Sequence, residues 1–143
     1  SQPAISKALP KLAKQEYLRV EKDKVSKRLS IELNRDNPMI IGLKRAENLK
    51  MIYELGLVGV FYDSFPGCSI LLFGSYARGE DTFNSDIDIA VIGAKEKNID
   101  IDKYEKKLGK KVRINYYSSF KDIHKHLLNN ILGGIILKGS VDL

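Results

Sequence analysis

The sequence has no apolar run near the roughly 18 consecutive residues that a membrane-spanning helix needs, which excludes a transmembrane helix. Residues 1–12 have neither the apolar segment nor the cleavage site of a secretory signal peptide. The single cysteine, Cys68, excludes an internal disulfide, and it has no Cys or His neighbour at zinc-ligand spacing. We therefore expect a cytoplasmic protein with no membrane partner, in which Cys68 packs in the core.

Internal repeats and low-complexity segments are also absent, and 43% apolar with 29% charged residues over 143 residues is typical of one soluble globular core. The charge is uneven along the chain. Residues 1–36 contain nine Lys/Arg and five Asp/Glu, whereas the other 107 residues contain fifteen and thirteen. This basic first quarter favours a polyanionic partner such as nucleic acid, and the alternative is a solvated, lysine-rich surface.

The basic first quarter is predicted to form a helix and a β-hairpin. Ser1 can cap a helix whose apolar residues recur at helical spacing and which should end near Tyr17. Two runs with alternating apolar residues follow, at residues 17–21 and 28–33. They predict a hairpin with one apolar face and a lysine-rich tip.

A basic helix followed by such a hairpin resembles the recognition helix and wing of a winged helix-turn-helix DNA-binding domain. Such domains normally have two more helices before the recognition helix, so the segment is expected to be either part of a longer reader of DNA or no longer one. The resemblance implies that duplex DNA would contact a set of basic side chains. These are Lys7, Lys11, Lys22, Lys24, Lys27 and Arg28.

A polar break that ends in Pro38 predicts a domain boundary, with a partial winged-helix-like segment at 1–37 and a second domain at 38–143. The apolar spacing predicts helices at 39–55 and 58–64. Beyond them strands alternate with helices, which predicts an α/β (α+β) fold with a small mixed sheet. The expected strands are 69–73, 86–92, 111–117 and 134–138, and the expected helices are 75–79, 100–108 and 120–132.

Two features of the second domain suit phosphate chemistry. Gly74 and Ser75 end an apolar strand and open a helix, so backbone N–H groups and the Ser75 hydroxyl can face a phosphate. Asp86 and Asp88 lie two apart in the next strand and should project from one face, an arrangement that suits Mg²⁺. Alone, a Gly-Ser turn is usually only a turn, and Asp-x-Asp is usually a solvated strand face.

Together, Gly74-Ser75, ten intervening residues and Asp86-x-Asp88 match the G-S-x(10)-D-x-D signature of the polymerase-β-like nucleotidyltransferases. The intervening Tyr76-Ala-Arg-Gly-Glu80 and Asn84-Ser85 resemble the small, stand-alone minimal nucleotidyltransferase branch. The resemblance covers about residues 67–140. It implies transfer of a nucleoside monophosphate from a nucleoside triphosphate, ATP by family, to a hydroxyl acceptor, with release of pyrophosphate.

The resemblance also implies roles for single residues. Gly74 and Ser75 would hold the triphosphate, and Asp86 and Asp88 would be the catalytic carboxylates that bind Mg²⁺ or Mn²⁺. Arg78 and Lys95 could add positive charge near the phosphates, the alternative being that both are ordinary exposed cations. Tyr76 is better explained by packing than by a contact with nucleotide.

The family takes a third carboxylate from the following strand, and this sequence departs from that pattern. In the strand at 111–117 the two residues expected to face the site are Arg113 and Asn115, and neither is acidic. We therefore expect nucleotide binding to be retained and transfer to be weak or absent. Elsewhere, His124 and His126 lie two apart on a predicted helix, so they should diverge as surface residues.

Two functions remain open from the sequence. The first is a nucleotidyltransferase, or its descendant, and its family relatives commonly pair with a small helical partner of the HEPN type. The second is a DNA-binding transcriptional regulator that uses a degenerate nucleotidyltransferase domain as a nucleotide sensor or interaction module.

Overall fold

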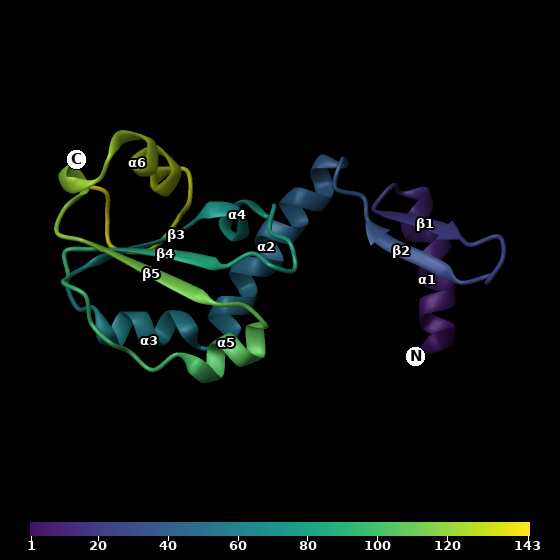
Figure 1. Ribbon diagram of the computed structural model, residues 1–143, viewed down its shortest axis with the longest axis horizontal. Helices are drawn as coiled ribbons and strands as arrows, with labels where there is room; N and C mark the ends of the chain where they lie inside the picture. The colour runs from purple at the N-terminus through teal and green to yellow at the C-terminus, as the bar shows by residue number, and fades with distance from the viewer. The chain divides into compact units, whose positions relative to one another are not determined.

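In the computed structural model, which describes residues 1–143, the chain divides between Leu43 and Lys44 into two units (Figure 1). Helix α2 (Pro38–Glu54) runs through this division, and the domain boundary at residue 37 stays a prediction. None of the helices is long and apolar enough to cross a membrane.

The first unit contains the predicted helix and hairpin. Helix α1 (Gln2–Lys14) starts at the Ser1 cap, whose hydroxyl accepts a 3.4 Å hydrogen bond from the Ala4 amide. It ends at Lys14, earlier than the expected Tyr17, because the chain turns through a left-handed Glu16 with φ of 60°. Strands β1 (Leu18–Lys22) and β2 (Leu29–Leu33) then pair antiparallel.

This first unit has little core of its own. No residue of α1 is buried, and the apolar hairpin residues Leu29, Ile31 and Leu33 remain exposed. Helix α1 lies against β1, and the groove between helix and hairpin is lined mainly by Leu9, Pro10, Ala13, Val20 and Leu29. The helix and hairpin are confirmed, while their likeness to a winged helix stays a prediction.

The second unit continues from α2 through the predicted alternation of strands and helices. Its further elements are α3 (Leu57–Ser64), β3 (Ser69–Phe73), α4 (Gly74–Arg78), β4 (Ile87–Ile92), α5 (Asp102–Leu108), β5 (Val112–Tyr117), the 3₁₀ turn η1 (Phe120–Asp122), α6 (Lys125–Leu132) and β6 (Ile135–Lys138). The four strands form one mixed sheet in the order β5-β4-β3-β6. Strand β3 is antiparallel to both neighbours, whereas β4 and β5 are parallel, which confirms the mixed α/β sheet.

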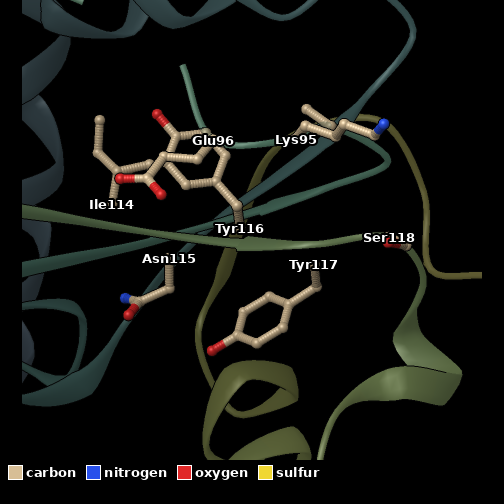
Figure 2. A pocket seen from close by; sticks show the side chains of 8 residues that line it. Lys95, Glu96, Ile114, Asn115, Tyr116, Tyr117 and Ser118 are labelled. Atoms are coloured by element: carbon tan, nitrogen blue, oxygen red, sulfur yellow. The ribbon is translucent and has the colours of Figure 1, made fainter. Parts of the chain in front are cut away.

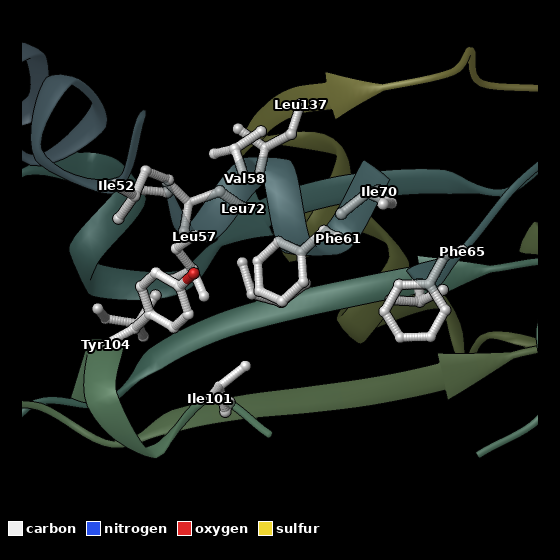
Figure 3. Packing of buried hydrophobic residues seen from close by; sticks show 14 of the residues in the cluster. Ile52, Leu57, Val58, Phe61, Phe65, Ile70, Leu72, Ile101, Tyr104 and Leu137 are labelled. Atoms are coloured by element: carbon white, nitrogen blue, oxygen red, sulfur yellow. The ribbon is translucent and has the colours of Figure 1, made fainter. Parts of the chain in front are cut away.

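The two faces of this sheet are covered by different helices. The first face carries Ile87, Ile89 and Val91 of β4 and packs against α2, α3 and α5 (Figure 3). The opposite face carries Ala90 and Ile92 and packs against η1 and α6. Each fully buried Ile or Phe side chain contributes about 1.5–3 kcal/mol. The alternation of side chains along β4 therefore determines which of its residues point to the first face of the sheet and which point to the opposite face.

The continuous helix expected at 120–132 is wrong. The chain makes the single turn η1, becomes extended at Ile123, and begins α6 only at Lys125. This break allows Phe120 and Ile123 to enter the same core cluster. It also brings His124 and His126 together, with ring centroids 5.5 Å apart, so the expected divergence of the two rings is wrong although both residues are exposed as predicted.

Two glycines give a matched test of this packing. A Cβ added at Gly134, where α6 leads into β6, would lie 2.1 Å from the Leu72 carbonyl oxygen, whereas one added at Gly59 on α3 would meet nothing within 4 Å. We expect Gly134→Ala to lower the free energy of unfolding by about 2 kcal/mol or more through overpacking. Gly59→Ala should raise it by about 0.5–1 kcal/mol through helix propensity. Urea denaturation of both variants checks this, and equal effects would contradict the packing described.

Candidate active site

The turn between β3 and α4 closely approaches one carboxylate. Gly74 follows the buried Phe73 with φ of 78°, a left-handed conformation that favours glycine. A Cβ at this position would lie 2.6 Å from Oδ2 of Asp88, so only glycine lets the turn and the carboxylate come this close. The short helix α4 starts there and ends at Arg78, before a left-handed Gly79 with φ of 73°. The Gly-Ser turn and the acidic strand are thus brought together, as the spacing predicts.

Asp86 directly precedes β4 and Asp88 is the second residue of this strand; alternation puts both on the face opposite the buried Ile87 and Ile89. The register pairs Asp88 with Phe73 of β3 on one side and with Arg113 of β5 on the other. Burial raises the pKa of Asp88; the Arg113 charge opposes this shift and the Asp86 charge adds to it. The two carboxylates therefore share one face and interact electrostatically.

Strand β5 supplies a cation on the strand from which a third carboxylate would come. A terminal guanidinium nitrogen of Arg113 donates to Oδ2 of Asp86 at 2.6 Å. Asn115 lies two residues further along, beside Ala90, and its amide donates to the Ile89 carbonyl at 3.3 Å. Both residues lie on the Asp88 face of the sheet, but only Arg113 contacts a site carboxylate.

The donor set suits one hard divalent cation. Two carboxylates provide the oxygen ligands that Mg²⁺ prefers, and water and phosphate oxygens can complete its octahedron. No group of three or more His, Cys, Asp or Glu side chains that could hold a metal ion occurs in the structure. The residues present therefore fit a single ion held by Asp86 and Asp88, and they do not fit a second ion that depends on another carboxylate.

Arg78 and Lys95 lie in different places. Arg78 is the last residue of α4. Its guanidinium donates hydrogen bonds to the side chains of Glu80 and of Asn130 on α6, both at 2.9 Å. Lys95 follows the far end of β4, beyond the bend at Gly93, and its side chain is exposed. This position fits the alternative of an ordinary exposed cation, and a role of Lys95 near the phosphates stays a prediction.

A surface hollow lies at that far end of the sheet. It is lined by residues after β4 and along the edge strand β5, including Lys95, Glu96, Asn115 and Tyr117 (Figure 2). Asn115 and Tyr117 project from one side of β5 and Tyr116 from the other. Neither the Gly74 turn nor Asp86 and Asp88 lines this hollow. It is therefore separate from the candidate site.

Sequence reasoning missed a buried charge cluster behind the site. Asp81 is only 4% exposed, and its carboxylate accepts 2.8 Å hydrogen bonds from Lys44 and Asn48 of α2. Lys110 lies 3.5 Å from its other oxygen. The only sequence signal was the spacing of Lys44 and Asn48, which lie four apart and so share a helix face. Nothing near Asp81 in sequence marks it as buried.

This cluster holds the segments that carry the site. Lys110 donates to the carbonyls of Thr82 at 2.6 Å and Ser85 at 3.3 Å, directly before Asp86. The Asn48 amide donates to the Tyr76 carbonyl, and the Tyr76 hydroxyl donates back to the Asn48 carbonyl. Burial, helped by nearby acidic charges, raises the pKa of Tyr76 to about 12. The packing role expected for Tyr76 is confirmed.

The charge cluster predicts a pH-dependent stability. Burial opposes the charge of Asp81, but the bonds from Lys44 and Asn48 and the charges of Lys44 and Lys110 outweigh it and lower its pKa below the ordinary 3.8. A lowered acid pKa stabilises the fold above the unfolded value, and this stability is lost as the pH falls through the folded value. Asp81→Asn should therefore cost about 3 kcal/mol at pH 7.

The difference between this variant and the wild type should shrink once the pH falls below about 4. Urea denaturation at pH 7 and near pH 3 measures it, with the exposed Asp63→Asn as the control. A cost that stays constant across this range would show that the Asp81 charge does not stabilise the fold.

Comparison with known proteins identifies related sequences and structures. Residues 43–137 match the family model described as a nucleotidyltransferase domain. A toxin–antitoxin crystal structure with AMP-PNP is 27% identical, with a TM-score of 0.44, and the match covers 61% of this chain and 73% of that one. A mutant of the toxin–antitoxin MntA–HpeT is 26% identical, with a TM-score of 0.45 and the same coverage. No significant match was found among curated proteins.

Proposed function

Because this chain belongs to the nucleotidyltransferase domain family, we propose that it binds a nucleoside triphosphate with one divalent cation and transfers the nucleoside monophosphate slowly to a hydroxyl acceptor. One observation carries the proposal. The Gly74 turn approaches Asp88 so closely that a Cβ would be 2.6 Å from its carboxylate. A turn suited to phosphates and a pair of acids suited to a metal therefore form one site.

Each residue has a role in this proposal. Gly74 and Ser75 bind the triphosphate, and Arg78, the last residue of the α4 helix that begins at Gly74, adds positive charge. Asp86 and Asp88 hold Mg²⁺ or Mn²⁺, which when bound neutralises phosphate charge and orients the triphosphate. ATP is the nucleotide that the family resemblance implies, and a HEPN-type protein partner is likewise implied only by that resemblance.

The slow rate follows from the acids that the chain provides. Phosphoryl transfer depends on positioning and charge neutralisation, and activation of the attacking hydroxyl needs a base or a further cation. In the family that position has a carboxylate, whereas here Arg113 donates a hydrogen bond to Asp86. A guanidinium cannot accept a proton at neutral pH. The protein therefore binds its nucleotide without a residue on β5 that can activate the acceptor.

The first test of this proposal is metal-dependent nucleotide binding. Without a cation, Asp86 and Asp88 repel a triphosphate, so we expect a fluorescent ATP analogue to bind only with Mg²⁺ or Mn²⁺. Asp88→Asn should weaken this binding at least about tenfold, because the lost charge-assisted contact is worth more than about 1.4 kcal/mol. Fluorescence titration measures the change.

The control for this titration is Asp63→Asn, which alters an exposed acid on α3. Circular dichroism should show an intact fold in both variants, since Asp88 is only partly buried and belongs to neither core cluster. Equal nucleotide affinity of wild type and Asp88→Asn in Mg²⁺ would refute the site. Incubation with α-³²P-labelled ATP, Mn²⁺ and cell extract then tests transfer, which should be far below about one per second.

A second candidate function has its own observation. All six basic residues predicted to contact DNA are exposed, and four of them gather at the tip of the β1–β2 hairpin. The tip itself is ordered by Asp23, whose carboxylate accepts from the amides of Val25 and Ser26. An exposed, basic hairpin is the kind of surface that enters a groove of duplex DNA. We therefore keep a DNA-binding regulator as the alternative function.

Salt dependence tests this alternative in the full chain. If the hairpin contacts phosphates, affinity for duplex DNA should fall steeply with salt, and replacing Lys22, Lys24 and Lys27 with Ala should reduce the slope of log K against log salt by up to about three. The matched control replaces Lys103, Lys106 and Lys107, which are exposed on α5. Fluorescence anisotropy measures both. An unchanged slope in the hairpin variant would leave the solvated-surface interpretation.

A further inference from the structure

The Arg113–Asp86 ion pair places a fixed positive charge inside the proposed site. The guanidinium lies 2.6 Å from Oδ2 of Asp86, and the side chains are 64% and 31% exposed. Exposed pairs of this kind are weakly held because water screens the charges and both side chains lose rotamer freedom. Arg113 is therefore positioned at the site and can exchange one anionic partner for another.

The sheet determines what Arg113 can reach. Phe73, Asp88 and Arg113 lie side by side on three neighbouring strands, with Asp88 in the middle. Two strand spacings, about 10 Å, separate the backbone of Arg113 from the strand that ends at the Gly74 turn. An extended arginine side chain and a triphosphate bound at Gly74 and Ser75 span that distance together. Phosphate is also the anion that the planar guanidinium fork matches best.

The charges of the site residues limit how many metal ions can bind beside Arg113. Asp86 and Asp88 carry two negative charges and Arg113 carries one positive charge, so a single divalent cation already gives the three residues and the metal a net positive charge. A second divalent cation would lie beside both the first ion and the guanidinium. No further carboxylate is there to offset this repulsion.

We propose that Arg113 takes the place of a second divalent cation: the site binds nucleoside triphosphate with one metal ion, and the guanidinium turns from Asp86 to the phosphates when they arrive. This inference rests on the proposed function and adds to it the number of cations and a nucleotide-binding residue on β5. The turn of Arg113 leaves both oxygens of Asp86 free for the single metal ion. The guanidinium thus pairs with Asp86 in the apo protein and with the phosphates in the nucleotide-bound protein.

Counting bound Mn²⁺ by electron paramagnetic resonance tests the proposal directly. The probe is an ATP analogue with a methylene group between the α and β phosphorus atoms, which binds but cannot be cleaved there. At saturating analogue, wild type should bind one Mn²⁺ and Arg113→Asp should bind two, because the new carboxylate restores ligands and removes the repelling charge. Arg113→Ala should keep one Mn²⁺ and bind the analogue at least about tenfold more weakly.

Asn115→Asp is the matched control. It adds the same carboxylate to the same face of β5, but beside Ala90 and away from Asp86, so it should still bind one Mn²⁺. Thermal unfolding should confirm that each variant is folded, which the exposure of Arg113 favours. Two Mn²⁺ ions in wild type, one in Arg113→Asp, or unchanged analogue affinity in Arg113→Ala would overturn this inference alone. A wild type that binds neither the analogue nor Mn²⁺ would instead overturn the proposed function, and the inference with it.

Discussion

The register of β4 between β3 and β5 is the constraint on which the candidate site depends. It pairs Asp88 with Phe73 on one side and with Arg113 on the other. A slip of one residue would turn the buried Ile87 and Ile89 out to solvent and place carboxylates in the core. The apolar face of β4 therefore holds the acidic face in position.

Two ion clusters near this strand differ in burial, and the difference separates their roles. Asp81 and its partners Lys44 and Lys110 have side chains that are 6%, 20% and 13% exposed, so water screens them little and breaking the cluster is costly. Arg113 and Asp86 are 64% and 31% exposed, and their pair contributes at most about 1 kcal/mol. The buried cluster fixes the loop before Asp86, while the exposed pair is free to change partners.

Most of the fold was predictable because its signals are local. The strands expected at 69–73, 86–92, 111–117 and 134–138 each match a strand of the sheet, and glycines such as Gly56, with φ of 87°, marked the ends of helices. The break at Ile123 was not predictable, since Phe120 and Ile123 fit a helical spacing and only the tertiary core favours an extended residue between them. Local pattern gives the elements, and packing decides where they are interrupted.

The candidate site, like the fold, was only partly predictable from the sequence. The same-face placement of Asp86 and Asp88 follows from strand geometry alone. The buried position of Asp81 could not be foreseen, because it depends on which parts of distant segments meet in space. The pairing of Arg113 with Asp86 lies between these cases: alternation placed Arg113 on the correct face, and only the parallel register of β5 selected it over Asn115.

The presence of Arg113 beside Asp86 has different consequences for nucleotide binding and for nucleotide transfer. Binding a triphosphate requires neutralisation of its ground-state charge, to which a guanidinium contributes as a metal ion does. Transfer requires, in addition, that the acceptor hydroxyl lose its proton as the bond to phosphorus forms, and an arginine that is always protonated gives no help with that proton. A cation at position 113 therefore supports the bound nucleotide without helping the acceptor hydroxyl to lose its proton. In the proposed function, the same residue that strengthens nucleotide binding makes the protein a slow transferase.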